Sequence, residues 1–179
     1  MRQCWQLWEA ALPKEKCEEI IEICRKRPLT DATIFAGSEY ETIKEFRETK
    51  VAWVNDLNIK SMMRFYFNEA NRNAFGIDID YLPDSQYGEY NEGSFYNWHH
   101  DINWEADTPY DRKLSIVIQL SDPKDYEGGQ FEFKSIENPN FHAQGSVLVF
   151  PSYLVHRVSE ITKGTRKSLV NWIEGPRWR

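Results

Sequence analysis

The residues after Tyr87 form short apolar and β-branched runs separated by turn residues, and this pattern constrains the fold more than any other feature of the chain. Such runs are typical of β-strands. Turns are expected at Asn91–Gly93, Glu127–Gly129, Asn138–Asn140 and Lys163–Thr165, where glycine, asparagine and proline gather. The strands are predicted at 87–90, 94–99, 114–120, 130–134, 146–150, 155–160 and 167–173. Strands this short and this numerous favour an antiparallel sandwich or barrel.

The first half of the chain has a helical pattern in two places. Apolar residues recur with helical spacing between Pro13 and Pro28, which predicts an amphipathic helix there. A second helix is predicted over Asn58–Phe75, with Gly76 as its stop. Lys50–Val54 has the composition of a strand. The predicted fold class is therefore α+β, mainly β, with helices packed on one face of the β core.

The chain of 179 residues has the length of one domain. We expect a single domain over 1–179, with a helical part over about 1–80 and a β core over about 81–176. No apolar run approaches the roughly 20 residues that span a bilayer, and Met1–Glu9 lacks the basic and apolar segments of an export signal. These features predict a cytoplasmic protein with no membrane partner. The formal net charge of −6 argues against nucleic acid as the main partner.

The three cysteines, Cys4, Cys17 and Cys24, are predicted to be free thiols. Cys17 and Cys24 lie two turns apart on the first predicted helix, about 10 Å along its axis, which is too far for a disulfide. An odd number of cysteines in a chain without an export signal is typical of small hydrophobic residues in a reducing compartment.

Three of the four histidines fall in two places. His99 and Asp101 are two positions apart on an extended segment, so their side chains point to the same side, while His100 points away. His156 lies 55 positions after Asp101, on a later predicted strand. Two histidines and one carboxylate form the facial triad that holds Fe(II) and leaves other coordination positions open. The alternative for such a pattern is a solvated turn together with a histidine satisfied in the core.

Further residues favour a binding site over that alternative. Arg166 follows His156 by ten positions, and a guanidinium is the natural partner of a carboxylate. Ser168 lies two positions further on the same predicted strand, so it shares a face with Arg166 and can bind the same carboxylate. The segments Gly128–Phe133 and Gly145–Ser152 stand between the two parts of the triad, as a scaffold of turns and strands requires.

Four ordered motifs resemble those of the Fe(II)- and 2-oxoglutarate-dependent dioxygenases, in particular the branch of prolyl 4-hydroxylases and prolyl/lysyl hydroxylase-type bacterial and viral proteins. The resemblance covers roughly half of the chain, over about Tyr87–Pro176. The motifs are Y-x-x-G-x-x-Y-x-x-H-x-D at 90–101, the glycine pair at 128–129, F-P-S-x-x-x-H-R-V at 150–158 and G-T-R-x-S-L-V-x-W at 164–172.

The resemblance implies a fold and an iron site. The fold is a double-stranded β-helix, which is a jelly-roll, cupin-like core with N-terminal buttressing helices. The implied iron ligands are His99, Asp101 and His156. The implied cofactors are Fe(II), 2-oxoglutarate as co-substrate and O2, with ascorbate as an addition found in the family.

The resemblance also assigns a co-substrate pocket. Arg166 is implied to bind the distal carboxylate of 2-oxoglutarate, with Ser168 as a second partner. Tyr90 is similar to the tyrosine that lines this pocket. Gln119 takes a position where related prolyl hydroxylases often have a tyrosine, so the detailed lining departs from theirs.

Several aromatic and basic residues near the motifs have two interpretations each. Trp172 shares a face with Arg166, so it can close the pocket or pack in the core. Arg47 and Trp53 resemble a stretch that reaches the active-site mouth in this branch, but a surface arginine and a core tryptophan fit equally well. The polar segment Asn103–Asp111 is expected to be a loop over the site. Residues that flank the iron motif are Trp98, Trp104 and Tyr110.

The remaining histidines have simpler interpretations. His100 is expected to be exposed or to lie beside the site. His142, which precedes a predicted strand, is expected to be a surface or packing residue.

The implied function is hydroxylation of a C–H bond with release of succinate and CO2. The substrate expected is a prolyl residue in a peptide or protein, or a free amino acid. Asp101 favours hydroxylation over halogenation, because the related halogenases lack this carboxylate. Two alternatives stay open. One is oxidative demethylation of nucleic acid, which needs a basic groove, and the other is a cupin-like metal-binding module that has no need of Arg166.

Overall fold

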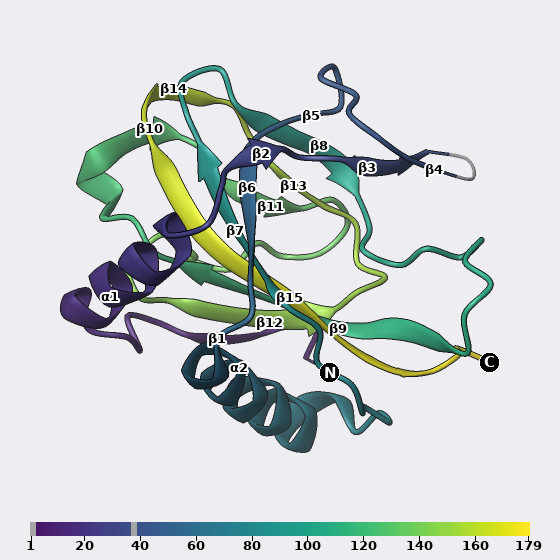
Figure 1. The fold of residues 1–179 in the computed structure, drawn as a ribbon. Helices are drawn as coiled ribbons and strands as arrows, with labels where there is room; N and C mark the ends of the chain where they lie inside the picture. Colours follow the sequence, from purple (N-terminus) through teal and green to yellow (C-terminus); the bar gives the residue numbers. More distant parts are fainter. Residues whose placement is uncertain (1–2, 37–38) are drawn as a thin grey trace.

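The computed structural model describes residues 3–36 and 39–179, and within these ranges the chain forms two main antiparallel sheets with two α-helices on one side (Figure 1). In this part of the chain the larger sheet has seven strands, in the order β1 (Gln6–Trp8), β12 (Val147–Pro151), β9 (Tyr110–Gln119), β15 (Arg166–Pro176), β7 (Ser85–Tyr90), β6 (Lys50–Val54) and β2 (Thr30–Asp31). The smaller sheet has four described strands, in the order β11 (Phe131–Phe133), β13 (His156–Val158), β8 (Phe95–His99) and β5 (Arg47–Glu48). Two separate strand pairs join β10 (Tyr126–Gly128) to β14 (Ile161–Gly164) and β3 (Ile34–Ala36) to β4 (Glu39–Glu41). A short 3₁₀ turn, Pro123–Asp125, precedes β10.

Both helices pack on the same outer face of the larger sheet (Figure 1). α1 (Lys14–Arg25) is the first predicted helix. α2 (Leu57–Ala70) begins after Asp56, whose carboxylate accepts hydrogen bonds from two backbone N–H groups of the first turn. The helix continues as a π-helical turn over Asn71–Phe75 and ends at Gly76, which has a left-handed backbone with φ of 61°. The second predicted helix is therefore confirmed, with a change of helix type at its end.

The larger sheet separates two apolar clusters. The outer cluster joins the sheet to the helices and includes Ile20, Phe67 and Ile116. The inner cluster contains residues of both sheets and includes Val117 and Phe131. Neighbouring residues of a strand point to opposite faces, so β9 contributes to both clusters. Side chains of the larger sheet that share the side of Val117 therefore face the space between the sheets.

The part of the chain expected to be helical, over about 1–80, also contains strands, of which only Lys50–Val54 was predicted. Four of these strands belong to the main sheets: β1, β2 and β6 are part of the larger sheet, and β5 is part of the smaller one. Only β6 has a sequence signal, because the others are two or three residues long and are defined by the partners they pair with. β10 and β14 replace parts of predicted turns, and their pairing contains a register shift between Glu127 and Gly128.

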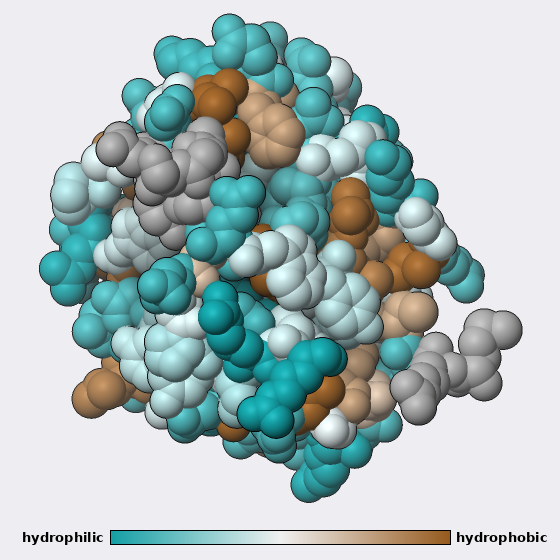
Figure 2. Space-filling model, turned by 90° about the vertical axis from the view of Figure 1, so that its right-hand side faces the viewer, coloured by the Kyte–Doolittle hydropathy of each residue, from teal (hydrophilic) through white to brown (hydrophobic). Residues whose placement is uncertain are grey.

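The surface is mixed in character. On the face drawn in Figure 2, apolar residues form separate patches between hydrophilic ones. No helix in the described part of the chain is long and apolar enough to cross a membrane.

Candidate active site

His99, Asp101 and His156 converge between the two sheets. The two histidines are cross-strand partners on β8 and β13, and their ring centroids are 4.2 Å apart. His99 Nε2 is 3.7 Å from Asp101 Oδ1, and His156 Nε2 is 3.6 Å from Asp101 Oδ2. One potential ligand atom from each residue lies within 4.8 Å of the others. The structure thus brings together the residues that the sequence predicts as metal ligands.

Backbone carbonyls hold both imidazole rings in the orientation that metal binding needs. The Nδ1 atom of His99 lies 2.7 Å from the carbonyl oxygen of Asn97, and that of His156 lies 2.8 Å from the carbonyl oxygen of Leu154. A carbonyl only accepts, so Nδ1 of each ring carries the proton and donates it. In the neutral form of each ring, Nε2 then has a lone pair on the side of Asp101, as in metal-ligating histidines.

Two serines orient the carboxylate of Asp101. Ser115 Oγ donates to Asp101 Oδ2 at 2.6 Å, and Ser152 Oγ lies 2.9 Å from Ser115 Oγ. Because the single Ser115 proton goes to the carboxylate, Ser152 is the donor in the second contact. The backbone N–H of Asp101 also donates to the carbonyl of Ser152 at 2.9 Å. The carboxylate is therefore fixed in position as a ligand before any metal arrives.

The charges of these groups suit a divalent metal. Burial by itself raises the pKa of Asp101, but His156, His99 and the Ser115 hydroxyl outweigh it and hold the pKa below its ordinary value. Burial, followed by the nearby His156, lowers the pKa of His99 to about 3. The site therefore presents a carboxylate and a neutral imidazole, which are the ligand forms that Fe(II) binds.

Arg166 lies in the cavity that holds the triad, and its side chain is only 2% exposed. Ser168, two positions along β15, is also buried and lines the same cavity. Tyr90 is the cross-strand partner of Arg166 on β7, and its ring centroid is 5.6 Å from the guanidinium carbon. Among the residues that the structure describes, no carboxylate forms an ion pair with Arg166. A buried guanidinium without a counter-charge is unfavourable unless a ligand supplies an anion.

The glycine pair at 128–129 shapes the surroundings of Arg166. Gly128 and Gly129 have φ of 78° and 60°, which L side chains rarely adopt. A Cβ atom on Gly129 would lie 3.1 Å from Arg166 Cδ and would overlap Ile161. A Cβ atom on Gly128 would overlap the carbonyl oxygen of Glu160. Gly129 therefore lets the turn pack against the arginine, and Gly128 lets it pack against the backbone of Glu160.

Trp172 and Gln119 occupy different places relative to the cavity. Trp172 lines it and is 8% exposed, so both of its interpretations hold. Gln119 is a cross-strand partner of Ser168 but is not among the residues that line the cavity. Its amide nitrogen donates to the carbonyl of Ser121 and to the hydroxyl of Tyr126, at 3.2 Å and 2.9 Å. Its contact with a co-substrate stays a prediction.

The structure contradicts the interpretation of Arg47 as a surface arginine and of Trp53 as a core tryptophan. Arg47 is not a surface residue, because it is 7% exposed and lines the cavity. Trp53 is not a core residue, because it is 50% exposed. Its ring lies 6.2 Å from that of Trp172, centroid to centroid. The reason is that β6 lies near the edge of the larger sheet, where Trp53 is left uncovered.

The other flanking residues lie at or near the surface. His100 and His142 are exposed, as expected, and the ring of His100 is 6.3 Å from that of Trp104. The end of the predicted loop Asn103–Asp111 belongs to β9, which begins at Tyr110. Trp98 and Arg157 stack, with the guanidinium carbon 4.6 Å from the ring centroid.

Four residues that contact the site groups carried no assigned role in the sequence. Ser115 and Ser152 hold Asp101, as described above. Tyr96 stacks on His99 with ring centroids 3.4 Å apart, and Gln86 accepts a hydrogen bond from Arg47. Ser115 had a usable signal, since it is a polar residue inside an apolar run.

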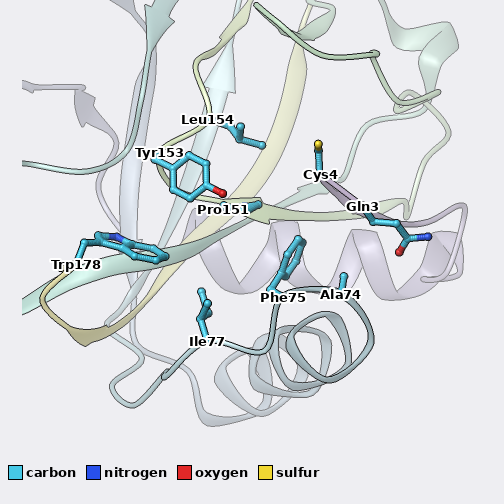
Figure 3. A pocket seen from close by; sticks show the side chains of 9 residues that line it. All are labelled: Gln3, Cys4, Ala74, Phe75, Ile77, Pro151, Tyr153, Leu154 and Trp178. Carbon is cyan, nitrogen blue, oxygen red and sulfur yellow. The ribbon is translucent and has the colours of Figure 1, made fainter. Parts of the chain in front are cut away.

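A second cavity lies outside the space between the two sheets and is larger, at about 290 Å³ (Figure 3). Its walls are mainly aromatic and aliphatic, and Figure 3 labels Phe75, Ile77, Tyr153, Leu154 and Trp178 among them. None of its described lining residues carries a charge.

Comparisons of the chain with known proteins agree on one family. The sequence profile described as the 2OG-Fe(II) oxygenase superfamily matches residues 85–174, which is half of the chain. The chain belongs to this superfamily, and it is a 2-oxoglutarate-dependent dioxygenase similar to prolyl 4-hydroxylases. The superfamily implies Fe(II), 2-oxoglutarate and O2 as cofactors, and the His–Asp–His donor set fits the metal.

The relatives differ in how much of the chain they match. A PKHD-type hydroxylase of Gloeothece citriformis is 26% identical over 165 residues, which cover 91% of this chain and 74% of that protein. A PKHD-type hydroxylase of Idiomarina loihiensis is 33% identical over 87 residues, which cover 48% of this chain and 39% of that protein.

Solved structures show the same fold. The viral collagen prolyl hydroxylase of Paramecium Bursaria Chlorella virus-1 has a TM-score of 0.74 at 18% identity and covers 97% of both chains. A Pseudomonas putida prolyl-4-hydroxylase has a TM-score of 0.74 at 21% identity, with 97% of this chain and 93% of that chain covered. The predicted jelly-roll core is therefore confirmed.

Proposed function

We propose that this dioxygenase hydroxylates an aliphatic C–H bond of a prolyl residue in a peptide or protein, or of a free amino acid, and releases succinate and CO2. The observation that carries the proposal is the buried, unpaired guanidinium of Arg166 in the same cavity as the His–Asp–His centre. The names of the relatives, PKHD-type hydroxylase and prolyl-4-hydroxylase, support the substrate class.

The chain's own residues would divide the work in the following way. His99, Asp101 and His156 would hold Fe(II) on one side, which leaves the other coordination positions for ligands. Arg166, with Ser168, would bind the distal carboxylate of 2-oxoglutarate and so direct its keto-acid end toward the metal. Bound together, iron and 2-oxoglutarate would activate O2, which is the oxidant that the hydroxylation of an unactivated C–H bond needs.

The surroundings of the site serve the same chemistry. Val117, Phe131 and Val170 give the cavity apolar walls, which limit the access of water. Ser115 and Ser152 keep the Asp101 carboxylate in place, so the ligand set is organised in advance. The shape of the site is then set before substrate binds.

A coupled assay tests the proposal. Purified enzyme with Fe(II), 2-oxoglutarate and O2 is offered proline-containing peptides, free amino acids and a methylated single-stranded oligonucleotide, with and without ascorbate, and succinate and hydroxylated product are measured. We expect succinate and product in equal amounts with a prolyl or amino-acid substrate and none with His156→Ala. Release of formaldehyde from the oligonucleotide would instead indicate a demethylase. Metal binding without any 2-oxoglutarate consumption would indicate a cupin-like module.

A further inference from the structure

The site cavity has a second buried cation at a place that the reaction as described does not use. Arg47, from β5, is 7% exposed and lines the cavity together with Gln86, which is 6% exposed. Arg47 Nη2 donates to Gln86 Oε1 at 2.8 Å, and Arg47 Nη1 donates to the carbonyl of Thr33 at 3.4 Å. The hydrogen bond to Gln86 fixes the side-chain amide of Gln86 with its NH2 group turned away from the arginine.

Aromatic stacking holds Arg47 near the metal ligands. Its guanidinium carbon lies 4.3 Å from the centroid of the Tyr96 ring, and the other stacking partner of Tyr96 is His99, at 3.4 Å between centroids with the planes 10° apart. The charge of Arg47 therefore stands one aromatic ring away from the iron site. A guanidinium in this position is fixed in place and has little freedom to reach solvent.

Arg47 keeps unused donors. A guanidinium has five N–H groups, and within residues 3–36 and 39–179 only two of those on Arg47 have partners. No carboxylate of the described chain forms an ion pair with it. Arg112, whose guanidinium carbon lies 4.1 Å from the centroid of the Trp172 ring, differs because its charge interacts with the carboxyl groups of Glu174 and Asp101. Arg47 thus resembles Arg166 in being a buried cation that lacks an anion.

When Fe(II) and 2-oxoglutarate are both bound in the cavity, the positive charge of Arg47 would still have no counter-charge. The two positive charges of Fe(II) and the one on Arg166 are matched by Asp101 and the two carboxylates of 2-oxoglutarate. The other residues that line the cavity are uncharged when the histidines are neutral. One positive charge, that of Arg47, therefore remains in a buried space, where an uncompensated charge is unfavourable.

We infer that Arg47 and the Gln86 amide form a subsite for a carboxylate of the hydroxylated substrate. This inference rests on the proposed function and sharpens it, because it excludes an internal prolyl residue as the preferred substrate. An internal prolyl residue offers a neutral carbonyl, whereas a free amino acid or the C-terminal residue of a peptide offers a carboxylate. The carboxylate gains charge-assisted hydrogen bonds and removes the excess charge.

Binding without turnover tests the inference. The protein is loaded with Fe(II) and 2-oxoglutarate under anaerobic conditions, the visible charge-transfer band of the chelated keto acid is recorded, and ligands are titrated by calorimetry. The ligands are the common L-amino acids, their α-amides, glycyl-L-proline and N-acetyl-L-prolinamide. The variants are Arg47→Gln, Arg47→Lys and, as a control for the same loss of charge at an exposed position, Lys44→Gln.

We expect at least one acid to bind about 10- to 100-fold more tightly than its amide, as for a hydrogen bond to a charged group. This preference should disappear in Arg47→Gln, persist in part in Arg47→Lys and be unchanged in Lys44→Gln. Comparison of L-proline with glycyl-L-proline separates a free amino acid from a peptide C-terminus.

The inference would be overturned by equal binding of acids and amides, by tight binding of N-acetyl-L-prolinamide, or by no binding of any acid. If the charge-transfer band is present in that case, the proposed function still stands. This comparison in the wild type holds even if the Arg47 variants do not fold. Absence of the band would remove the proposed function and the inference with it.

Discussion

The outer cavity and the inner cavity around the triad differ in both size and charge. The outer cavity has about 290 Å³ and is lined by uncharged side chains, whereas the inner one has only about 40 Å³ and contains Arg47, Asp101, Arg166 and two histidines. Volume therefore does not locate the site. Buried arginines that lack a counter-charge in the protein do, because the cost of burying their charge is recovered only when a ligand supplies an anion.

The two cavities share one wall, which makes the comparison testable. In the segment between β12 and β13, Tyr153 and Leu154 line the outer cavity. Ser152, from the same segment, and His156, the first residue of β13, serve the inner one. Changes on the two sides of this wall should have very different effects on turnover.

The largest effect is expected for His156→Ala. Loss of one of three metal ligands should lower turnover on the order of 1,000-fold, equivalent to about 4 kcal/mol of activation free energy. Metal content by elemental analysis and succinate release check this. His142→Ala, at an exposed histidine, should change neither, and an active His156→Ala enzyme would contradict the assignment of the triad.

A smaller effect is expected for Arg166→Ala. Removal of the charge-assisted hydrogen bonds should raise the KM for 2-oxoglutarate roughly 10- to 150-fold. Arg166→Lys should recover part of the loss because it keeps the charge but not the two-pronged geometry. Steady-state kinetics measure both, with Lys167→Ala as the neighbouring control. An unchanged KM in Arg166→Ala would mean that the co-substrate binds elsewhere.

Ser115→Ala should weaken metal binding, but less than the loss of a metal ligand does. The variant loses the 2.6 Å hydrogen bond to Asp101, and groups that orient ligands typically contribute roughly 10- to 100-fold in metal affinity or activity. Competition with a metal chelator gives the affinity of the variant. Ser135→Ala, an exposed serine, is the matched control. Equal metal affinities in the two variants would show that Ser115 does not position Asp101.

The smallest effect on turnover is expected from a label on Cys4, which lines the outer cavity. Burial is the main cause that raises the pKa of Cys17 to about 11 and that of Cys24 to about 12, so both stay protonated at pH 8 and unreactive. Cys4 is exposed. Mass spectrometry after treatment with a thiol reagent at pH 8 should find Cys4 alone modified until the protein is unfolded.

The labelled enzyme should keep its kcat within about twofold of the untreated value, which corresponds to about 0.4 kcal/mol. A large loss of activity after selective labelling of Cys4 would show that the outer cavity is coupled to the site.

The inner site was largely predictable from the sequence because its chemistry lies in closely spaced motifs. His99 and Asp101 alternate on one extended segment, and Arg166 and Ser168 alternate on another. This spacing fixes which side chains share a face. The fold of the β core followed for the same reason, since its central strands carry strong signals of their own.

What the sequence did not predict depends on partners that are distant along the chain. The burial of Arg47 requires the pairing of β5 with β8 and the side chain of Gln86. The role of Ser115 appears only when β9 is placed beside β12 and the Asp101 segment. Short strands such as β1 have no composition signal, because pairing with β12 is what makes them strands.

One measurement tests the central claim most directly. Metal-free protein is titrated anaerobically with Fe(II) and then with 2-oxoglutarate, and the visible charge-transfer band of the chelated keto acid is followed in the wild type, Arg166→Ala and His156→Ala. We predict a saturable band in the wild type, a band that needs much more 2-oxoglutarate in Arg166→Ala, and none in His156→Ala. Stoichiometric iron binding with no band in the wild type would contradict the account of this cavity as the site where iron and 2-oxoglutarate meet.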